Sequence, residues 1–529
     1  MPLAVPVANG PSLTSVFATS TIRAGSQRLF APRRVGPAAA NGRRSSEVKV
    51  CRVFKKQAGV MSSEIARREF FVSAPWAVAG VVSAGAAAAQ ENPPNAKVVR
   101  EPPRDTPVVH ECDVCVIGGS CTGVFAAVAA ARLGAKVAIV EHNGFFGGVA
   151  TASLVNIWHS LWDLRRENKI VGGLTEEVID RLRRVHAVTE HFRSAPGKGS
   201  NHYELNSEVL KFELDHLVVE AAIRPFLHTM FVCPVVEDGR MTAAIIEDKS
   251  GRRAIRARQF VDATGDADVI ARMGLGVYQR ENLQPPTYTC ILRGMDKIAR
   301  ENPDFNINRV IFDTQYEQAI REGHSWTASV PGAEGHLMLA GARVFGVDCS
   351  DADQLTQASL DGRRKVEAIC ELVREHFQEG KGVPLAWLPA KIGVRETRHA
   401  HCRHTLTSEE LLTGHRFEDA IGNGTYPIDV HRADRAGITW GHLPKNVPFY
   451  QIPFSSLVPR GAKNVLVAGR NIDADEGAFG AVRVMVNCNQ MGQAAGVAAW
   501  QALDSDTPVD SLDMSKLRAT LRDQGAVIV

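Results

Sequence analysis

The sequence has almost no net charge, and this absence narrows the choice of partners. It contains 61 Lys and Arg against 58 Asp and Glu, which gives a formal net charge of +3. Residues 1–60 hold ten of the basic residues and a single acid, Glu47, so the rest of the chain is slightly acidic. A nucleic-acid-binding protein usually has a basic patch on its folded part. The charge distribution therefore gives no support for nucleic acid as a partner.

The sequence also lacks a cysteine framework. Its ten cysteines do not follow the regular spacings of disulfide-rich domains. Cys112 and Cys115 lie three apart, and in a strand such residues point to opposite faces, which suits neither a zinc site nor a redox pair. We expect both to be buried thiols.

Strongly apolar runs are missing near the N-terminus. Residues 1–60 are rich in Ser, Ala, Pro and Arg, which is typical of disorder or of a transit peptide. Residues 61–90 contain two adjacent arginines, Arg67 and Arg68, followed by a weakly apolar stretch. Small residues near the end of this segment, Ala87–Ala89, would suit a signal cleavage site. This segment resembles a twin-arginine signal peptide.

We therefore expect Met61 to be the true start, and the protein to be exported folded and to be periplasmic or secreted. The alternative is a membrane anchor formed by an uncleaved signal, which Pro75 and the neighbouring glycines and serines weaken. After cleavage we expect no stable membrane anchor. Residues 91–110 contain five prolines, which predicts an extended linker.

The most informative stretch is DVCVIGGSCTGVFAAVAAARLGAKVAIVE, from Asp113 to Glu141. An apolar run, glycines, an alanine-rich stretch and a second apolar run predict a β-α-β unit with a dinucleotide-binding turn. Gly118 would make the tight turn, Gly123 would let the helix pack on the strand, and Glu141 would bind an adenosine ribose. Ser120 replaces the usual middle glycine, but its small hydroxyl side chain is compatible with a phosphate contact.

With this motif the chain resembles the FAD-dependent oxidoreductase family of flavoproteins with two dinucleotide-binding domains, which includes relatives of heterodisulfide reductase flavoprotein subunits. The other segments that carry the resemblance are GGVAT at 147–151, FVDATGDAD at 260–268, GVRETR at 393–398, LTSEELLTGHRFEDAIGNGTYPIDVH at 406–431, and YQIPFSSLVPRGAKNVLVAGR at 450–470, followed by GAVRVM and MGQAAGVAA. The implied fold class is α/β, a Rossmann-like FAD-binding domain with an inserted substrate or cap domain.

The resemblance implies FAD as the cofactor and assigns residues to it. Gly118, Ser120 and Gly123 would surround the pyrophosphate, while Glu141 would hold the ribose. The other implied contacts are Gly147 and Gly148 near the phosphates and flavin edge, Val232 pairing its backbone with the adenine, Gly265 and Asp266 in the ATGD loop, Gly469 and Arg470 in a second glycine turn, and Arg483 and Val484 at the start of a helix that points at the flavin.

We expect both ends of the chain to build the FAD-binding domain. Residues 111–285 would be its first part, with some substrate-domain insertion near 155–205; residues 286–390 would form the substrate or cap region, and 391–529 the remainder of both. A second complete fingerprint, which a nicotinamide-dependent reductase usually needs, is missing between residues 145 and 460. We therefore expect the flavin to react directly with a small-molecule substrate and to pass its electrons to an unidentified acceptor.

Three residues are candidates for catalysis. Arg395 would stabilise an anionic flavin or substrate, since the resemblance places RETR on a strand beside the flavin. His159 and His431 are candidate bases because imidazole has a neutral form near pH 7. The resemblance also places Tyr426 and Asp429 near the active side. The expected reaction is hydride transfer between a small or carbohydrate-like substrate and flavin N5.

Two alternatives to this reaction stay open: a reductase that takes electrons from a protein donor, and a non-catalytic flavin-binding electron carrier. The heterodisulfide reductase kinship would allow an iron–sulfur cluster, but the cysteines after Cys121 lack ferredoxin spacing, so its ligands are not evident. His399 and His401 would share a face of a strand and could bind a metal. We nevertheless expect no metal there, because RETR is better explained as a flavin contact.

Overall fold

The computed structural model describes residues 97–192, 201–321 and 323–529. The expectations for residues 1–60 and 61–90, including the export signal, lie outside these described residues, as does the beginning of the 91–110 segment. Within the described ranges, no helix is both long enough and apolar enough to cross a membrane.

The central sheet has seven strands, most of them parallel. β1 (Val108–Ile117) pairs in parallel with β2 (Val137–Val140) on one side and with β9 (Gly251–Asp262) on the other. β6 (Arg224–Phe226) extends the sheet beyond β2. The last four residues of β1 and all of β2 are buried, as expected of unbroken apolar runs in a parallel sheet covered on both faces.

β9 brings the two ends of the chain together. Its first half pairs with antiparallel β8 (Arg240–Asp248), which pairs in turn with β7 (Met230–Glu237). Its last residues, Phe260 to Asp262, pair in parallel with β20 (Val465–Val467). A strand from the C-terminal region therefore ends beside β9, which itself lies next to β1, the strand that carries the first glycine turn.

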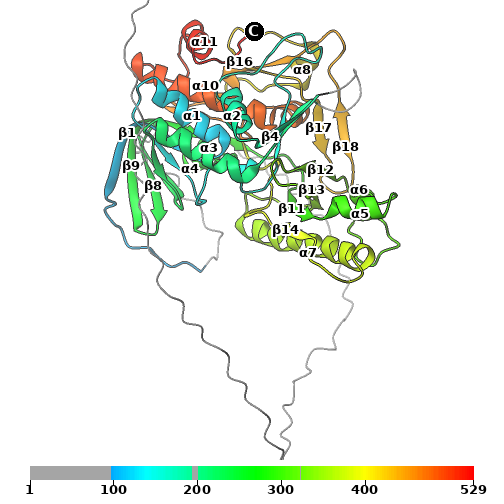
Figure 1. Ribbon diagram of the computed structural model, residues 1–529. Helices are drawn as coiled ribbons and strands as arrows, with labels where there is room; N and C mark the ends of the chain where they lie inside the picture. The colour runs from blue at the N-terminus through cyan, green and yellow to red at the C-terminus, as the bar shows by residue number, and fades with distance from the viewer. Residues whose placement is uncertain (1–96, 193–200, 322) are drawn as a thin grey trace, which may run out of the picture. The chain divides into compact units, whose positions relative to one another are not determined.

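Helices from the two ends of the chain also pack together. α1 (Cys121–Arg132), in blue-cyan, and α10 (Met485–Asp504), in orange-red, lie side by side in Figure 1. Glycine makes this contact possible. A Cβ atom at Gly492 would lie 2.1 Å from the carbonyl oxygen of Thr122, and one at Gly496 would lie 2.1 Å from that of Ala126.

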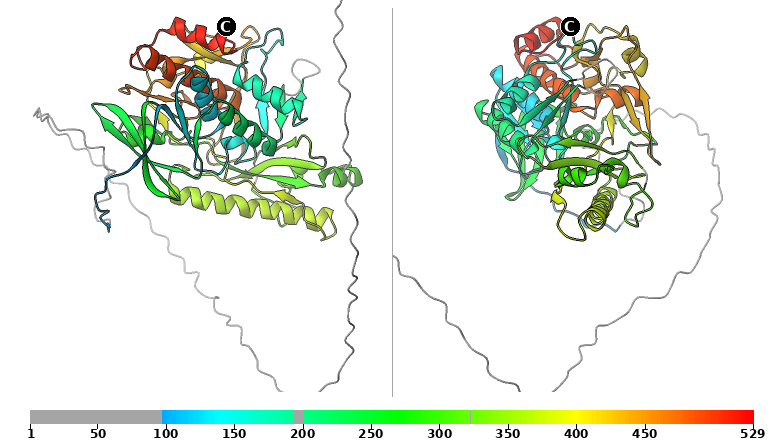
Figure 2. Two further views of the ribbon diagram at one scale, coloured as in Figure 1. Left: turned by 60° about the vertical axis from the view of Figure 1, so that its left-hand side comes forward. Right: turned by 45° about the vertical axis from the view of Figure 1, so that its right-hand side comes forward.

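A four-stranded antiparallel sheet has its own apolar core, formed by residues between Tyr288 and Val394. Its strand order is β12 (Trp326–Ser329), β13 (His336–Arg343), β11 (Thr287–Arg293) and β14 (Leu385–Trp387). The long helix α7 (Ala352–Phe377) packs along this sheet (Figure 2). Its buried residues recur at helical spacing, so one apolar stripe faces the sheet.

A third sheet joins β3 (Ile157–His159), β5 (His202–Leu205) and β4 (Val188–His191). The remaining α-helices are α2 (Leu174–Arg184), α3 (Ser207–Glu220), α4 (Asp268–Arg272), α5 (Met295–Glu301), α6 (Ile307–Val310), α8 (Ser408–Thr413), α9 (Glu476–Val482) and α11 (Met514–Asp523). The remaining strands and 3-10 helices are β10 (Val277–Tyr278), β15 (His399–Ala400), β16 (Ala420–Gly424), β17 (Ile428–His431), β18 (Ile438–Gly441), β19 (Tyr450–Pro453), η1 (Gly148–Ala150) and η2 (Phe454–Leu457).

Candidate functional site

A cavity of about 810 Å³ is lined by residues of the central sheet and of the four-stranded sheet. Its lining falls into two groups. One group consists of the glycine turn after β1, the end of β2 and the loops after β9 and β20. The other contains the polar and aromatic side chains of His159, Tyr426, Asp429, His431 and Trp440.

The turn after β1 requires its glycines for steric reasons. Gly118 has a φ of +103°, and a Cβ atom on it would lie 2.4 Å from the carbonyl oxygen of Ala263. A Cβ atom on Gly123 would lie 1.9 Å from the carbonyl oxygen of Gly118. Ser120 caps α1, because its Oγ accepts a hydrogen bond of 3.3 Å from the backbone N–H of Gly123. Since the oxygen accepts this bond, the hydroxyl hydrogen is left to donate.

Gly147 and Gly148 lie against this turn. The N–H of Gly147 donates to the carbonyl oxygen of Gly119 at 2.8 Å, and both glycines have positive φ, +116° and +56°. A Cβ atom on Gly148 would lie 2.7 Å from Cβ of Ser120. Ser120 therefore fits in the middle position of the fingerprint because Gly148, which lies against it, has no side chain.

Glu141 directly follows β2 and lies in the cavity wall. Its Oε2 accepts from the N–H of Gly119 at 2.7 Å, and its Oε1 accepts from the N–H of Asn143 at 2.8 Å. The side chain is buried but lines the cavity. A fixed carboxylate beside the glycine turn is suited to accept hydrogen bonds from a ribose.

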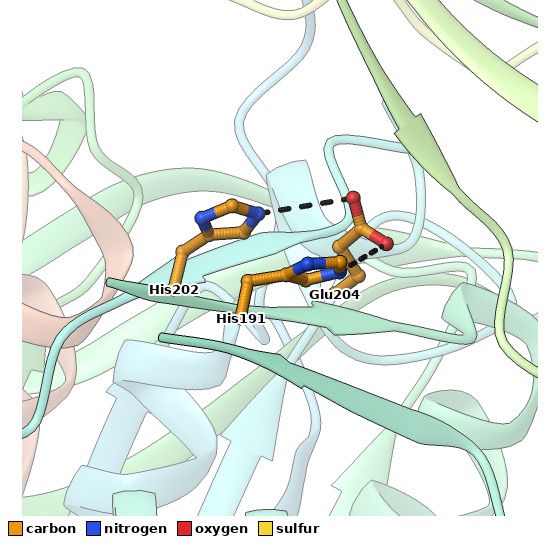
Figure 3. Close-up of side chains that lie close together, drawn as sticks. All are labelled: His191, His202 and Glu204. Atoms are coloured by element: carbon orange, nitrogen blue, oxygen red, sulfur yellow. Dashed lines mark ion pairs between the residues drawn. The ribbon is translucent and has the colours of Figure 1, made fainter. Parts of the chain in front are cut away.

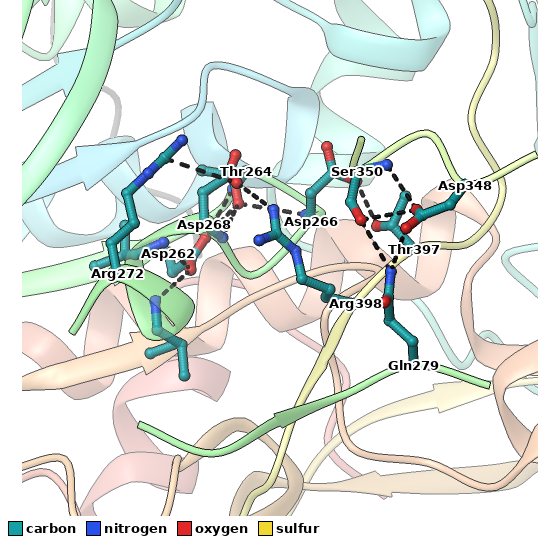
Figure 4. A network of polar contacts seen from close by, with 12 residues as sticks. Asp262, Thr264, Asp266, Asp268, Arg272, Gln279, Asp348, Ser350, Thr397 and Arg398 are labelled. Carbon is teal, nitrogen blue, oxygen red and sulfur yellow. Dashed lines mark hydrogen bonds and ion pairs between the residues drawn. The ribbon is translucent and has the colours of Figure 1, made fainter. Parts of the chain in front are cut away.

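The ATGD loop is held by the ion pairs and hydrogen bonds shown in Figure 4. Arg398 donates to Asp268 at 2.6 Å, and Thr397 donates to Asp266 at 2.7 Å. Asp266 also pairs with Arg470 at 3.0 Å. Burial alone would raise the pKa of Asp266, but Arg470 and Thr397 outweigh it and lower this pKa. The network joins the loops after β9 and β20 to the segment that carries Arg395.

Several polar groups at the cavity are left for a ligand. α10 begins with no side-chain cap, and Val484 and Met485 line the cavity at its start. Nη1 of Arg470 and both amide atoms of Asn489 are buried and have no hydrogen-bond partner among the described residues. Together with the N-terminus of α1, these groups suit phosphate oxygens and the polar edge of a flavin.

The family follows from a match along most of the described chain. The sequence profile of the FAD dependent oxidoreductase family matches residues 113–521. The chain belongs to this family of FAD-dependent oxidoreductases. This result confirms the family resemblance and the flavoenzyme class, and the cofactor is FAD; the kinship with heterodisulfide reductase stays a prediction.

Solved structures with a similar fold are more distant. One is a geranylgeranyl bacteriochlorophyll reductase-like protein from Thermoplasma acidophilum, with 14% identity over 78% of this chain and 84% of that chain and a TM-score of 0.41. Another is a myxobacterial chondrochloren halogenase, a variant of FAD-dependent halogenases, with 10% identity over 78% of each chain and a TM-score of 0.40. A search of curated proteins found no match.

Most residues that the sequence assigned to FAD line one cavity in this FAD-dependent oxidoreductase. They are Gly118, Ser120, Glu141, Gly147, Gly148, Gly265, Asp266, Gly469, Arg470, Arg483 and Val484. Gly123 does not line the cavity, because it faces the backbone of Gly118 and serves the packing of α1. Val232 does not line it either: the register of β7 shifts between Phe231 and Cys233, and Thr229, Met230 and Phe231 are the residues at the cavity.

The RETR segment also differs from the expectation. Residues 395–398 form no strand, and β15 begins only at His399. Arg395 lines the cavity, whereas Glu396 is buried in an ion pair with Arg280. His399 lies 3.3 Å from Glu396 and stacks on Tyr278. The charge of Glu396 is therefore neutralised away from the cavity, and of these two residues only Arg395 faces it.

The candidate bases are gathered around one carboxylate, Asp429. Nε2 of His431 lies 3.3 Å from Oδ1 of Asp429, while Tyr426 donates to Oδ2 at 2.9 Å. Arg483 donates to the same Oδ2 at 3.0 Å. The ring of His159 lies 4.1 Å from that of Tyr426, measured between centroids. The structure thus brings both histidines, from β3 and β17, to one side of the cavity.

Burial keeps both histidines neutral. It lowers the pKa of His159 to about 3, with His202 and Arg483 acting in the same direction. Burial and the positive charge of Arg395 lower the pKa of His431 to about 2, against the opposing effect of Asp429. Burial would raise the pKa of Asp429, but Arg483, His431 and Tyr426 reverse this and hold it well below its usual value. Near neutral pH, two uncharged bases therefore stand beside an ionised carboxylate.

An arginine that sequence reasoning missed lies beside this group. Arg343 ends β13 directly opposite Thr287, which lines the cavity, so the two side chains share a face of the sheet. Arg343 is only 3% exposed, and none of its three guanidinium nitrogens has a hydrogen-bond partner within the described chain. Burial lowers its pKa to about 10. The signal available in the sequence was a single arginine inside the otherwise apolar run LMLAGARVF.

Proposed function

We propose that this FAD-dependent oxidoreductase oxidises a small, carbohydrate-like donor that carries a carboxylate, with transfer of a C–H hydride to flavin N5. FAD, when bound, supplies the two-electron acceptor for this chemistry. The residues of the chain are left to bind the donor, orient it and accept the proton that accompanies the hydride.

The observation that carries the proposal is the excess of positive charge at the donor side. Burial lowers the pKa values of Arg343 and Arg395. The positive charges of Arg343 and Arg483 lower the pKa of Arg395 further, whereas the carboxylate of Asp429 opposes this effect. Asp429 is already paired with Arg483. A buried guanidinium without a partner is unfavourable until an anion reaches it. A carboxylate, which accepts two parallel N–H bonds, matches this group.

The proton follows from the arrangement around Asp429. A donor hydroxyl that is converted to a carbonyl loses one proton as the hydride leaves the adjacent carbon. His431 and His159 are both neutral and both line the cavity, so either can accept this proton. Asp429 lies 3.3 Å from His431 and would stabilise the imidazolium that forms, as a buried carboxylate does in hydrolytic triads.

The test is anaerobic mixing of the purified holoprotein with a donor panel while flavin absorbance is followed. The panel pairs each sugar or alcohol with the corresponding acid, for example glucose with gluconate. We expect bleaching of the flavin by acids, and weaker or no bleaching by their neutral partners. Equal bleaching by both members would remove the carboxylate from the proposal. Reduction by a ferredoxin-like protein alone would favour the reductase, and no reduction by any donor would favour an electron carrier.

We also propose export by the twin-arginine route, on the basis of Arg67 and Arg68 ahead of a weakly apolar segment. This route accepts folded proteins, which suits an enzyme that acquires FAD in the cytoplasm. Replacing both arginines with lysine should retain the protein in the cytoplasm, and cell fractionation measures this. Export of the double variant at the normal level would contradict the proposal.

A further inference from the structure

A second group of titratable side chains lies on the three-stranded sheet. His191 on β4 stands directly opposite His202 on β5, and Glu204 follows His202 by two positions. Residues two apart in a strand point to the same face. The three side chains therefore converge above one face of the β4–β5 hairpin, as Figure 3 shows.

The distances in this group suit a common metal ion. Nε2 of His191 lies 2.9 Å from Oε2 of Glu204, and Nε2 of His202 lies 3.8 Å from Oε1. Ligand atoms of a tetrahedral zinc ion are roughly 3.3 Å apart, given bonds of about 2.0–2.1 Å. The two observed distances lie on either side of this value. One ligand atom from each side chain can be chosen so that all lie within 4.8 Å of one another.

The ligand atoms are also in a suitable chemical state. Nε2 of His191 is close to Glu204, but it is buried and has no aligned hydrogen bond to any described residue. Glu204 is 5% exposed, and Ser329 of β12 donates to its Oε2. A neighbour outside the hairpin therefore holds the carboxylate in place, as is typical of ligands in metal sites.

We propose that His191, His202 and Glu204 form a binding site for a divalent transition-metal ion, with Zn²⁺ as the ion that this donor set suits best. Two imidazoles and one carboxylate are zinc ligands in enzymes that keep a fourth position open for water or substrate. Imidazole donors disfavour Mg²⁺ and Ca²⁺, which prefer oxygen ligands. Because His202 also lines the cavity described above, the ion would be bound at the wall of that cavity.

The test measures metal binding and needs no knowledge of the donor. The holoprotein is dialysed against a chelator and titrated with Zn²⁺ by calorimetry, and with Co²⁺ while visible absorption is followed. We expect one ion per chain and the intense bands of low-coordinate Co²⁺. In His191→Ala the Kd for Zn²⁺ should rise at least about 100-fold, because the loss of a residue that binds the ion directly costs more than the loss of a neighbour that hydrogen-bonds to a ligand, which costs about 10–100-fold.

Two features of the chain make this test decisive. The side chain of His191 is 43% exposed, so its replacement should leave the fold intact. Flavin content and circular dichroism verify this. Glu204→Gln is the second variant. His216 forms a two-residue pair with Glu213 at 3.4 Å on α3, so His216→Ala is the matched control and should bind Zn²⁺ like the wild type. Absence of stoichiometric binding in the wild type, or unchanged Kd in His191→Ala, would overturn the proposal.

Discussion

Replacement of Arg343 by methionine should change stability and donor binding in opposite directions. The guanidinium is 3% exposed and lacks hydrogen-bond partners among the described residues, so the protein without donor bears its desolvation cost. Methionine has similar length, is flexible and carries no charge. Replacing buried ionic groups by apolar ones of similar volume can stabilise a protein by about 1–4 kcal/mol. We expect the free energy of unfolding of the holoprotein to rise within this range.

The donor should bind more weakly to the same variant. A hydrogen bond to a charged group contributes about 1.5–3 kcal/mol, and every 1.4 kcal/mol corresponds to a factor of about ten. The KM for a carboxylate donor should therefore increase roughly 10- to 100-fold. If no donor in the panel bleaches the flavin, the Kd of gluconate, measured from its effect on flavin absorbance, replaces KM.

Arg416→Met serves as the control for this pair of measurements. Arg416 lies 4.0 Å above the ring of Phe449 and donates to its carbonyl oxygen at 3.3 Å, so its loss should destabilise the protein slightly and leave donor binding unchanged. Denaturant unfolding and steady-state kinetics give both quantities. An Arg343→Met protein that unfolds more easily than the wild type and binds the carboxylate equally well would refute the reasoning.

Three further predictions concern the cofactor site and its surroundings. Gly148→Ala should purify without flavin, because its φ is +56° and the new Cβ would lie 2.7 Å from Cβ of Ser120; flavin content equal to the wild type would contradict this geometry. Gly496→Val should force α10 away from Ala126, whose oxygen would lie 2.1 Å from the new Cβ, and lower the stability by at least about 1–3 kcal/mol, seen as a lower Tm. His431 is neutral in the folded state, with a pKa of about 2 against 6.5 when unfolded, so the unfolded state binds the extra proton and stability falls as the pH decreases below about 6.5. In His431→Gln the slope of unfolding free energy against pH between 6 and 4 should be smaller by up to about 1.4 kcal/mol per pH unit; an unchanged slope would mean that His431 is protonated in the folded protein.

Local sequence was sufficient for the cofactor turn. The unbroken apolar runs, the glycines and the acid at Glu141 predicted β1, α1 and β2, and the structure has them at Val108–Ile117, Cys121–Arg132 and Val137–Val140. This works because a strand, a glycine with positive φ and a capped helix are determined by neighbouring residues. A short apolar run could likewise locate β20. Neighbouring residues could not show which strand β20 joins, because its partner β9 is distant in the sequence.

Positions that depend on register or on distant partners were not accessible in this way. A shift in β7 moves Val232 off the cavity, and the ion pair with Arg280 turns Glu396 away from it. Neither a one-residue shift nor a partner more than a hundred positions away leaves a local sequence pattern.

The sequence by itself determined the family, the cofactor and the dinucleotide turn, since these rest on contiguous residues whose conformations are set by their neighbours. Only the tertiary structure decided the donor side. His159, Arg343 and His431 come from three separate sheets, and they share one electrostatic environment only after long-range packing has buried them together. Burial is a property of the whole fold. It is burial that makes the histidines neutral and leaves the guanidinium of Arg343 without a hydrogen-bond partner in the described part of the chain.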